Sequence, residues 1–567
     1  MIENLIKLLR TLACLKPSQL AFFVWRRKFP AASVQLAGAP EVASSIAVQA
    51  PIAISGIYRA ANQFRFLNIK KDLSGENINW SPSDVPRLWR YNLHYFDYLR
   101  ENERCASNKH SMIESWIDHN SQGSEPGWEP FTASLRIVNW VFYLVTENCS
   151  HHNKIIESLY LQALWLEKND ERHILANHYF ENLKALLFAG VFFKGDDAKR
   201  WRQRAMRDLL VQLEEQTLAD GGHYERSPQY HGLMLENYLD IYNLAISNPA
   251  YFSGDFVARF RVVAQQGLDF FNSILFPNRK IPLFNDSAFE IAPDASELNE
   301  YARQLFDYRS EATHSDVQII EKGDFGLYGV RSASDMLVMD CGEIGPAYQP
   351  GHTHCDFLSY ELMVGGEHIV VDTGVCEYEP GERRHFVRST KAHNTVRIDE
   401  LEQSEIWGEF RVARRAKKLL GSVESVGSNV VVTGAFEGFY SGWWRSKPRF
   451  KHERKMCVKL VKEAFDSIEV VDTIASCAST RVPVLVESFV HFHDSLRLSP
   501  VNERSVEIFR LNSVIARIDL PKDVAYRIEP SIYCPEFGLI KNNYCLVMQR
   551  KAMLPQELTY TIQLLRS

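Results

Sequence analysis

The spacing of apolar residues changes once along this chain, and the change limits the folds that the chain can adopt. Up to about residue 315 apolar residues recur with the period of a helix, and short breakers such as Gly195-Asp196-Asp197 separate the segments. The clearest helical segments are 134–146, 155–167, 177–193, 201–216, 228–247 and 256–275. Many consecutive antiparallel helices predict an (α/α) toroid or an irregular bundle.

Beyond that point, short β-branched runs replace the helical pattern. They are 326–331, 336–340, 429–433, 467–472, 482–490 and 560–565. Short strands at nearly regular spacing predict an antiparallel β-sandwich. We therefore expect three parts in the 567 residues: an N-terminal helix and connector at 1–55, an (α/α) toroid at 56–315, and a β-sandwich at 316–567.

The N-terminal segment is amphipathic, and Lys7, Arg10 and Lys16 interrupt its apolar runs. No clear small-residue cleavage site follows, so a signal peptide is not predicted. We expect a helix docked on the protein surface. The alternative is a helix apposed to a membrane through residues 20–25 and the basic residues 26–28. No run of about 18 apolar residues occurs, so no transmembrane span is predicted.

The composition argues against some classes of function. A net charge of −6 argues against a general nucleic-acid-binding protein, and a hydrophobic content of 46% indicates a globular chain. The ten cysteines form no CxxC pair, which favours free thiols and a reducing compartment. The 23 Tyr and 11 Trp suit a sugar-binding cleft as well as an ordinary core.

One short stretch of the β half gathers histidines and carboxylates. Gly351-His352-Thr353-His354-Cys355-Asp356 precedes an apolar strand, a Gly365-Gly366 turn and a returning strand that ends at Asp372, and His393 follows. The turn predicts a β-hairpin. Imidazole and carboxylate ligands suit zinc, but simple pairing across the turn would place Asp372 near Ser359 rather than near His354. The spacing alone leaves a metal site and a chance cluster of structural histidines both open.

Two stretches of the helical half carry polar residues suited to chemistry. Asn177, His178 and Glu181 share one face of a predicted helix, which is either part of a site or a helix start held by a neighbouring loop. Tyr230 falls in the first turn of a helix whose start is predicted at Ser227-Pro228. The positive end of a helix favours a phenolate there, and such a base suits removal of a weakly acidic C–H proton. A tyrosine that only packs in the helix start is the alternative.

Taken together, these motifs resemble the heparinase II/III-like polysaccharide lyases of the alginate lyase and heparinase superfamily. The resemblance covers most of the chain through 89–99, 127–140, 177–182, 227–231, 351–356 and 388–396. It implies an (α/α) toroid followed by a β-sandwich. It also implies β-elimination at a uronic acid of an acidic polysaccharide, with an unsaturated sugar as the product.

The resemblance further implies a role for each matching residue. Tyr230 resembles the family's base-and-acid tyrosine, and His352 resembles its second proton-transfer residue. Asn177, with His178 and Glu181 close by, resembles the group that neutralises the uronate carboxylate. The implied ligands of a structural zinc ion near the active site are His354, Asp372 and His393.

Three further residues are predicted to bind substrate: Arg136, Arg388 and His231. For each of the two arginines, a place in a structural ion pair is the alternative. An arginine can hold a carboxylate of the substrate with two hydrogen bonds. A phenol with a pKa near 10 needs a cationic or hydrogen-bonding neighbour in order to ionise, and His231 or His352 is expected to supply it. We expect the cleft between the two halves, because the candidate residues come from both.

Two other functions stay open. A catalytically weak glycan-binding or scaffold protein would keep the same fold. A zinc hydrolase would instead use His354, Asp372 and His393 to hold an open-site metal that activates water. Without a clear signal peptide, heparin is not the expected substrate; an acidic exopolysaccharide or capsule-like glycan of surface-polysaccharide metabolism is. The expected location is the bacterial cell envelope, the periplasm or the cytoplasm, and the oligomeric state is not predicted.

Overall fold

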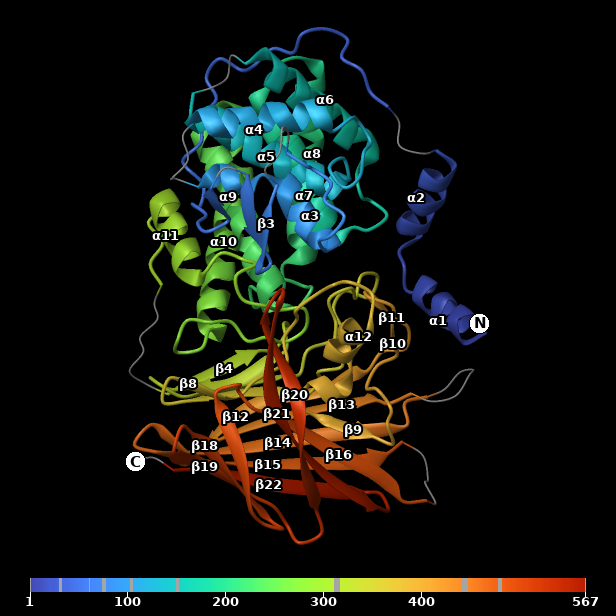
Figure 1. The fold of residues 1–567 in the computed structure, drawn as a ribbon, viewed down its shortest axis with the longest axis vertical. Coiled ribbons are helices and arrows are strands. Elements are labelled where there is room, and N and C mark those ends of the chain that lie inside the picture. Colours follow the sequence, from blue (N-terminus) through green and yellow to red (C-terminus); the bar gives the residue numbers. More distant parts are fainter. Residues whose placement is uncertain are drawn as a thin grey trace.

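The computed structural model describes residues 2–29, 33–60, 62–73, 78–101, 106–148, 152–310, 317–440, 447–477 and 482–565. A helical body and a β body are stacked along the long axis of the molecule, and two N-terminal helices lie at their side (Figure 1). The predicted succession of a helical half and a β half is confirmed. The predicted boundary at 315 and 316 lies outside the described residues; helix α11 ends at Phe306, and strand β4 begins at Gln318.

Helices α3 to α11 form the helical half. Their bounds are α3 Arg87–Tyr95, α4 Ala106–His119, α5 Pro130–Thr146, α6 Asn153–Asn169, α7 Ala176–Phe192, α8 Asp196–Gln216, α9 Pro228–Ser247, α10 Gly254–Ile274 and α11 Ala295–Phe306, with short 3₁₀ turns at Asp97–Arg100 and Pro249–Tyr251. The six segments predicted from apolar spacing correspond to α5 to α10. Sixteen of the 17 residues of α7 are buried, which makes α7 an internal helix with neighbours on every side.

A three-stranded sheet precedes these helices and was not predicted. Its strands are β1 Tyr58–Ala60, β2 Gln63–Phe66 and β3 Ile69–Asp72, in the order β1-β2-β3. Phe64 packs edge-on against Tyr98 at 5.3 Å between ring centroids, and Phe66 packs against Trp89 at 5.1 Å. Strands of three or four residues are too short for alternation to be recognised, so the sheet is held by these aromatic contacts rather than by a strong local pattern.

Three larger sheets build the β half, which is antiparallel as predicted. The strands are β4 Gln318–Lys322, β5 Leu327–Arg331, β6 Met336–Asp340, β7 Tyr360–Val364, β8 Glu367–Val370, β9 Val396–Ile398, β10 Ile406–Trp407, β11 Arg411–Val412, β12 Lys417–Val426, β13 Asn429–Gly438, β14 Phe450–Val461, β15 Ala464–Ser476, β16 Val484–His491, β17 Leu496–Asn502, β18 Ser505–Arg510, β19 Ser513–Asp519, β20 Ala525–Glu536, β21 Leu539–Ala552 and β22 Gln556–Leu564. The strand orders are β4-β5-β6-β7-β8, β12-β13-β14-β15-β22-β19-β18-β17 and β20-β21-β16-β9. Burial alternates along β14, so one face of its sheet covers the core.

The predicted hairpin of the histidine-rich stretch is confirmed as β7 and β8. Gly365 and Gly366 form its turn with φ of +61° and +80°, a conformation that glycine adopts without steric cost. The hydroxyl of Ser359 lies 3.4 Å from the carboxylate of Asp372, so the two residues are neighbours as predicted, although the register of the hairpin shifts between Leu362 and Met363. Helix α12 (Glu382–Arg388) and a 3₁₀ turn at Thr390–Ala392 follow before β9.

The two halves meet through a loop and a long hairpin. Segment 283–288, between α10 and α11, donates backbone N–H groups to residues of the β half; Leu283 donates to Glu361, Asn285 to Asp356 and Asp286 to His352. The β20–β21 hairpin extends towards the helical body (Figure 1), and near its tip the carboxylate of Glu536 accepts a bond from Asn68. Among the described residues, no helix is long and apolar enough to cross a membrane.

Candidate active site

Tyr230 lies in the first turn of α9, as predicted. The hydroxyl of Ser227 accepts a hydrogen bond from the backbone N–H of Tyr230 at 3.2 Å, so Ser227 is the N-cap, and Pro228 is the first helical residue. The phenol hydroxyl of Tyr230 is 3.3 Å from that of Tyr378. The start of α9 therefore presents the phenol to residues of the β half.

His352 lies directly against Tyr230. The two rings are stacked with 3.7 Å between centroids and 27° between planes. Nε2 of His352 is 3.2 Å from Glu225, and Nδ1 is 3.0 Å from Asp286. Burial lowers the pKa of His352, but the hydrogen bonds with these two carboxylates raise it to about 9. The histidine is thus an imidazolium at neutral pH.

The carboxylates that hold His352 were missed by the sequence argument. Glu225 precedes the N-cap of α9, and its pKa is lowered to about 2: burial raises it, but the bond and the charge of His352 outweigh that effect. Asp286 also contacts Nε2 of His354 at 2.8 Å and both terminal nitrogens of Arg384. In the sequence, the only local indication that Glu225 belongs to the site was the position of an acidic residue just before a helix start. Asp286 and Arg384 are 98 positions apart, so nothing local pointed to that pair.

Asn177 reaches the same group of residues. Its side-chain amide donates to both oxygens of Glu225, at 3.0 and 2.9 Å, and its backbone N–H donates to Glu225 at 3.1 Å. The first turn of α7 therefore binds a carboxylate that itself holds His352. The structure brings Asn177, Tyr230 and His352 into one cluster, which comes from both halves of the chain.

The other two predicted residues of α7 have different surroundings. Nδ1 of His178 is 3.1 Å from Glu171, and its ring lies 4.5 Å from that of Phe131. The carboxylate of Glu181 accepts a bond of 2.6 Å from Asn237 inside the helical body. Burial raises the pKa of Glu181. Neither residue makes a described contact with Tyr230 or His352, although the charges of Glu225 and His352 reach His178 and affect its pKa. Glu181 therefore lies apart from the cluster, whereas His178 lies at its edge.

The phenol of Tyr230 is less acidic than the sequence argument required. Burial, followed by the neighbouring Tyr378 and the charge of Asp286, raises its pKa well above the usual value. The expected lowering by His352 does not occur in this state, because Glu225 and Asp286 offset the positive charge of the imidazolium. The resting cluster therefore holds a proton on the phenol and another on the imidazole.

The three residues predicted to bind substrate have structural contacts instead. Both ring nitrogens of the buried His231 bond to backbone groups, the N–H of His223 at 3.1 Å and the carbonyl of Gly267 at 2.9 Å. Arg136 is fully buried; its guanidinium lies 3.9 Å over the ring of Trp116. These positions inside the helical body correct the expectation that His231 and Arg136 face a substrate.

Arg388 is also buried, and its contacts are backbone carbonyls. It donates to Thr353 from Nε and one terminal nitrogen, both at 3.2 Å, and to Gly408 at 2.8 Å. Burial lowers its pKa to about 10. Thr353 lies between His352 and His354, so Arg388 supports the segment that carries both histidines. This corrects its predicted role as a substrate ligand.

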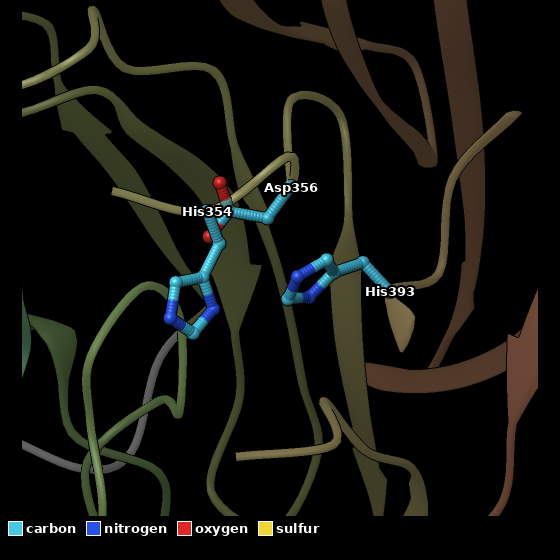
Figure 2. A group of neighbouring side chains, drawn as sticks. All are labelled: His354, Asp356 and His393. Carbon is cyan, nitrogen blue, oxygen red and sulfur yellow. The ribbon is translucent and has the colours of Figure 1, made fainter. Parts of the chain in front are cut away.

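A candidate metal centre lies beside this cluster. His354, Asp356 and His393 are buried, and one ligand atom from each lies within 4.8 Å of the others. His354 and Asp356 precede β7, whereas His393 precedes β9; Figure 2 shows the two imidazole rings turned towards each other, with 5.3 Å between centroids.

Asp372, the carboxylate that was predicted as a ligand, lies next to this group. Its Oδ2 atom is 2.8 Å from Nδ1 of His393. In the described arrangement Asp356 contributes the oxygen of the three-residue group, and Asp372 orients the ring of His393. Carboxylates that bond to a metal-ligating histidine commonly have this orienting role.

The residues present fit a divalent cation. Nδ1 of His354 and Nε2 of His393 are buried and have no hydrogen-bond partner among the residues that the structure describes, although such atoms are normally satisfied. The buried carboxylates of Asp356 and Asp372 lie close to His393. Burial raises the pKa of Asp356 to about 6; the charge of His393 opposes this rise, and the charge of Asp372 adds to it. Two imidazoles and a carboxylate are a ligand set suited to zinc.

Comparison with known families adds two matches that together extend over most of the chain. Residues 20–313 match the model described as "Heparinase II/III N-terminus", and residues 320–551 match "Heparinase II/III-like, C-terminal". The N-terminal match ends just before the predicted boundary between the two halves at 315 and 316, and the C-terminal match begins just after it.

Curated relatives and solved structures agree with the family matches. A heparin-sulfate lyase of Bacteroides thetaiotaomicron is 21% identical over 436 residues, which are 67% of this chain and 60% of that protein. One of Pedobacter heparinus is 28% identical over 39% of this chain and 36% of its own length. The chain thus matches less than two thirds of the length of these relatives.

The similarity of fold covers more of the chain. A crystal structure of heparinase III has a TM-score of 0.66 at 18% identity and covers 87% of this chain and 80% of its own. A heparan sulfate lyase structure from Pedobacter heparinus has a TM-score of 0.55 at 18% identity and covers 89% and 81%. The fold is therefore an (α/α) toroid followed by an antiparallel β-sandwich.

Proposed function

Because the chain belongs to the heparinase II/III family, we propose that it is a polysaccharide lyase that cleaves an acidic, uronic-acid-containing polysaccharide by β-elimination. The observation that carries the proposal is the stacking of Tyr230 on His352, with a carboxylate on each nitrogen of that histidine. The relatives named heparin-sulfate lyase support an acidic substrate. An exopolysaccharide or capsule-like glycan stays the predicted class.

The reaction first needs help at the substrate carboxylate. The proton on C5 of a uronate is weakly acidic, because its loss would add a second negative charge next to the carboxylate. Donors placed at this developing charge lower the cost. We assign this task to Asn177, whose amide already binds a carboxylate in the resting site. A bound uronate would take over the hydrogen bonds that Glu225 now accepts.

The proton transfers fall to Tyr230 and His352. Elimination needs one group that accepts the C5 proton and one that protonates O4 as the C4–O4 bond breaks. With both groups protonated at rest, the active form is the one that has lost a single proton. The raised pKa of Tyr230 makes the phenol the donor to O4, and neutral His352 is the acceptor of the C5 proton. In this assignment Tyr230 and His352 each transfer one proton, whereas the family resemblance implied that Tyr230 is both base and acid.

The candidate metal centre has a supporting role in this proposal. His354 and His393 would hold a zinc ion, with a carboxylate as the third ligand; a zinc ion held by protein ligands would stabilise the fold of this region. The geometry favours Asp356, whereas the family resemblance favours Asp372. Zinc content of purified Asp356→Asn and Asp372→Asn separates the two, because loss of a ligand lowers affinity more than loss of an orienting group.

The test of the activity is a screen of uronate-containing glycans for rising ultraviolet absorbance, which reports the new C=C bond. Tyr230→Phe removes one hydroxyl and should reduce turnover by orders of magnitude with folding intact. Tyr238→Phe is the matched control, because it removes a buried hydroxyl from the same helix α9. Equal activity of folded Tyr230→Phe and wild type would refute the assignment.

Measurement of new reducing ends and of glycan binding, made beside the ultraviolet screen, separates the alternatives. A zinc hydrolase would release new reducing ends without absorbance, and a scaffold protein would bind the glycan without release of product. The arrangement of Tyr230 and His352 favours the lyase, since a hydrolase that activates water on the metal needs no stacked phenol.

A further inference from the structure

The N-terminal helices α1 (Ile2–Leu12) and α2 (Pro17–Lys28) expose an unusual share of apolar side chains. Ten of the 25 exposed large hydrophobic residues in the described part of the chain lie between residues 2 and 29. They are Ile2, Leu5, Leu8, Leu9, Leu12, Leu20, Phe23, Val24, Trp25 and Phe29. Both helices lie at the margin of the molecule, beside the helical and β bodies (Figure 1). An exposed apolar concentration of this kind marks an interaction surface.

Polar side chains make most of the described contacts that hold these helices to the protein; among the apolar ones, Phe22 lies under the guanidinium of Arg172 at 5.3 Å. Arg10 pairs with Glu405 at 2.9 Å, and the hydroxyl of Thr11 accepts a bond of 3.1 Å from Trp407. Gln19 is the buried residue of α2 and donates to backbone carbonyls at His173 and Ile174. The apolar residues consequently face outwards, which is the reverse of an ordinary docked amphipathic helix.

The charge of the same segment differs from that of the rest of the chain. Residues 1–29 contain six basic residues and one acidic residue, a net charge of +5, whereas the whole chain carries −6. The remaining 538 residues therefore carry −11. Arg27 and Lys28 are exposed and adjoin Trp25 and Phe29, which are 48% and 58% exposed. A second copy of this surface would bring like charges together.

We propose that α1 and α2 form a peripheral membrane-binding element that inserts its apolar side chains into the interface of a bilayer rich in anionic lipids. Outward Leu, Phe and Trp residues with Lys and Arg at the edge are the composition of helices that lie in such an interface. Tryptophan favours the level of the headgroups. The element lies flat on the bilayer and does not span it. The proposal is independent of the lyase activity.

The element would also hold the cluster of Tyr230 and His352 close to the bilayer. The segment between α1 and α2 contacts both bodies near that cluster: Lys16 pairs with Glu215 of α8 and lies 4.0 Å over the ring of Tyr348, four residues before His352. This consequence, unlike the membrane binding itself, rests on the lyase activity proposed above: an enzyme held in this way would act on glycan at the membrane surface.

The test is co-sedimentation of the full chain with vesicles of phosphatidylglycerol and phosphatidylcholine, compared with vesicles of phosphatidylcholine alone. We expect binding to the anionic vesicles, weakened by salt, and at least tenfold weaker binding to the neutral ones. The double variant Arg27→Glu/Lys28→Glu should weaken binding by about fivefold or more for each residue. Val24→Asp/Trp25→Ser should abolish binding, because it removes apolar contact with the interface.

Matched controls separate this surface from general effects of charge and apolarity. Leu511→Asp alters an apolar residue that is 88% exposed in the β half, and Lys522→Glu/Lys551→Glu reverses two exposed lysines there. Both should bind the vesicles as wild type does. Circular dichroism and thermal melting check that every variant is folded.

Three results would overturn the proposal. The first is no binding to anionic vesicles by folded wild type. The second is equal loss of binding in the control variants. The third is self-association in light scattering that the Val24→Asp/Trp25→Ser variant abolishes, without vesicle binding by wild type; a second copy would then cover this face.

Discussion

The substitution Glu225→Gln tests whether the neighbouring carboxylates keep His352 protonated. It keeps the size of the side chain and an oxygen that can accept from Asn177, but it removes one of the two carboxylates that charge His352. The other carboxylate, of Asp286, is at a similar distance. Together they raise the pKa of His352 from 6.5 to about 9 against the effect of burial. Removal of one should lower it by about 1 to 1.5 units, or about 1.4 to 2 kcal/mol.

The consequence is a shift in the pH dependence of elimination. If neutral His352 accepts the C5 proton, kcat/KM of wild type rises with pH up to about 9. In Glu225→Gln the rising limb should lie about 1 to 1.5 units lower. At pH 7 the variant should then be faster by about threefold to tenfold, because a larger fraction of His352 is neutral while the base is weaker. The measurement is the initial rate of ultraviolet absorbance between pH 5 and 10.

A matched control separates this effect from the loss of any buried carboxylate. Asp472 is buried in the sandwich and contacts His452 at 2.8 Å and Arg454 at 2.7 Å. Asp472→Asn should lower the unfolding free energy and leave the rising limb where it is. A limb that stays in place in Glu225→Gln, or moves to higher pH, would refute the assignment of His352 as the titrating base.

Further predictions concern stability, the metal centre and a corrected residue. Because the pKa of His352 is raised in the folded state, the stabilisation that its charge provides is fully present below pH 6.5 and is lost as the pH rises through about 9. Between pH 6 and 10 the unfolding free energy of wild type, measured with denaturant, should therefore fall by about 2 to 3 kcal/mol. The variant His352→Gln should not show this loss. His393→Ala should lose bound zinc and thermal stability together. A chelator that lowers the thermal stability of wild type should leave that of the variant unchanged. Wild type that is purified without chelators and contains no metal would contradict the zinc site. Arg388→Lys should cost about 2 to 4 kcal/mol in unfolding free energy through its lost bonds to backbone carbonyls, with KM unchanged, whereas a raised KM with normal stability would restore its predicted contact with substrate.

Local patterns were sufficient for much of the fold. Apolar spacing located the helices α5 to α10, and a serine followed by a proline located the start of α9 at Ser227. The Gly365-Gly366 turn predicted the hairpin and the closeness of Asp372 to Ser359, but not the shift of register between Leu362 and Met363. These features depend on residues that are close in sequence, where side-chain period and turn chemistry act directly.

Contacts between distant residues were beyond such patterns. Asp286 lies 66 positions from His352 and 98 from Arg384, so its role appears only when the two halves pack. The pKa of Tyr230 was also predicted in the wrong direction, because the charges of distant residues in the cluster were not known. A histidine beside a phenol was expected to lower the pKa of the phenol, but two carboxylates already offset that histidine, and burial then dominates.

Segment 283–288 has a consequence for recombination between relatives. This short loop belongs to the helical half, yet Asp286 sets the charge of one histidine of the β half and contacts another. A chimera that joins the helical half of one family member to the β half of another would therefore take the histidine at position 352 from one parent. The aspartate at position 286, which keeps that histidine protonated, would come from the other parent. We expect such a hybrid to fold but to lack activity unless segment 283–288 comes from the same parent as His352 and His354.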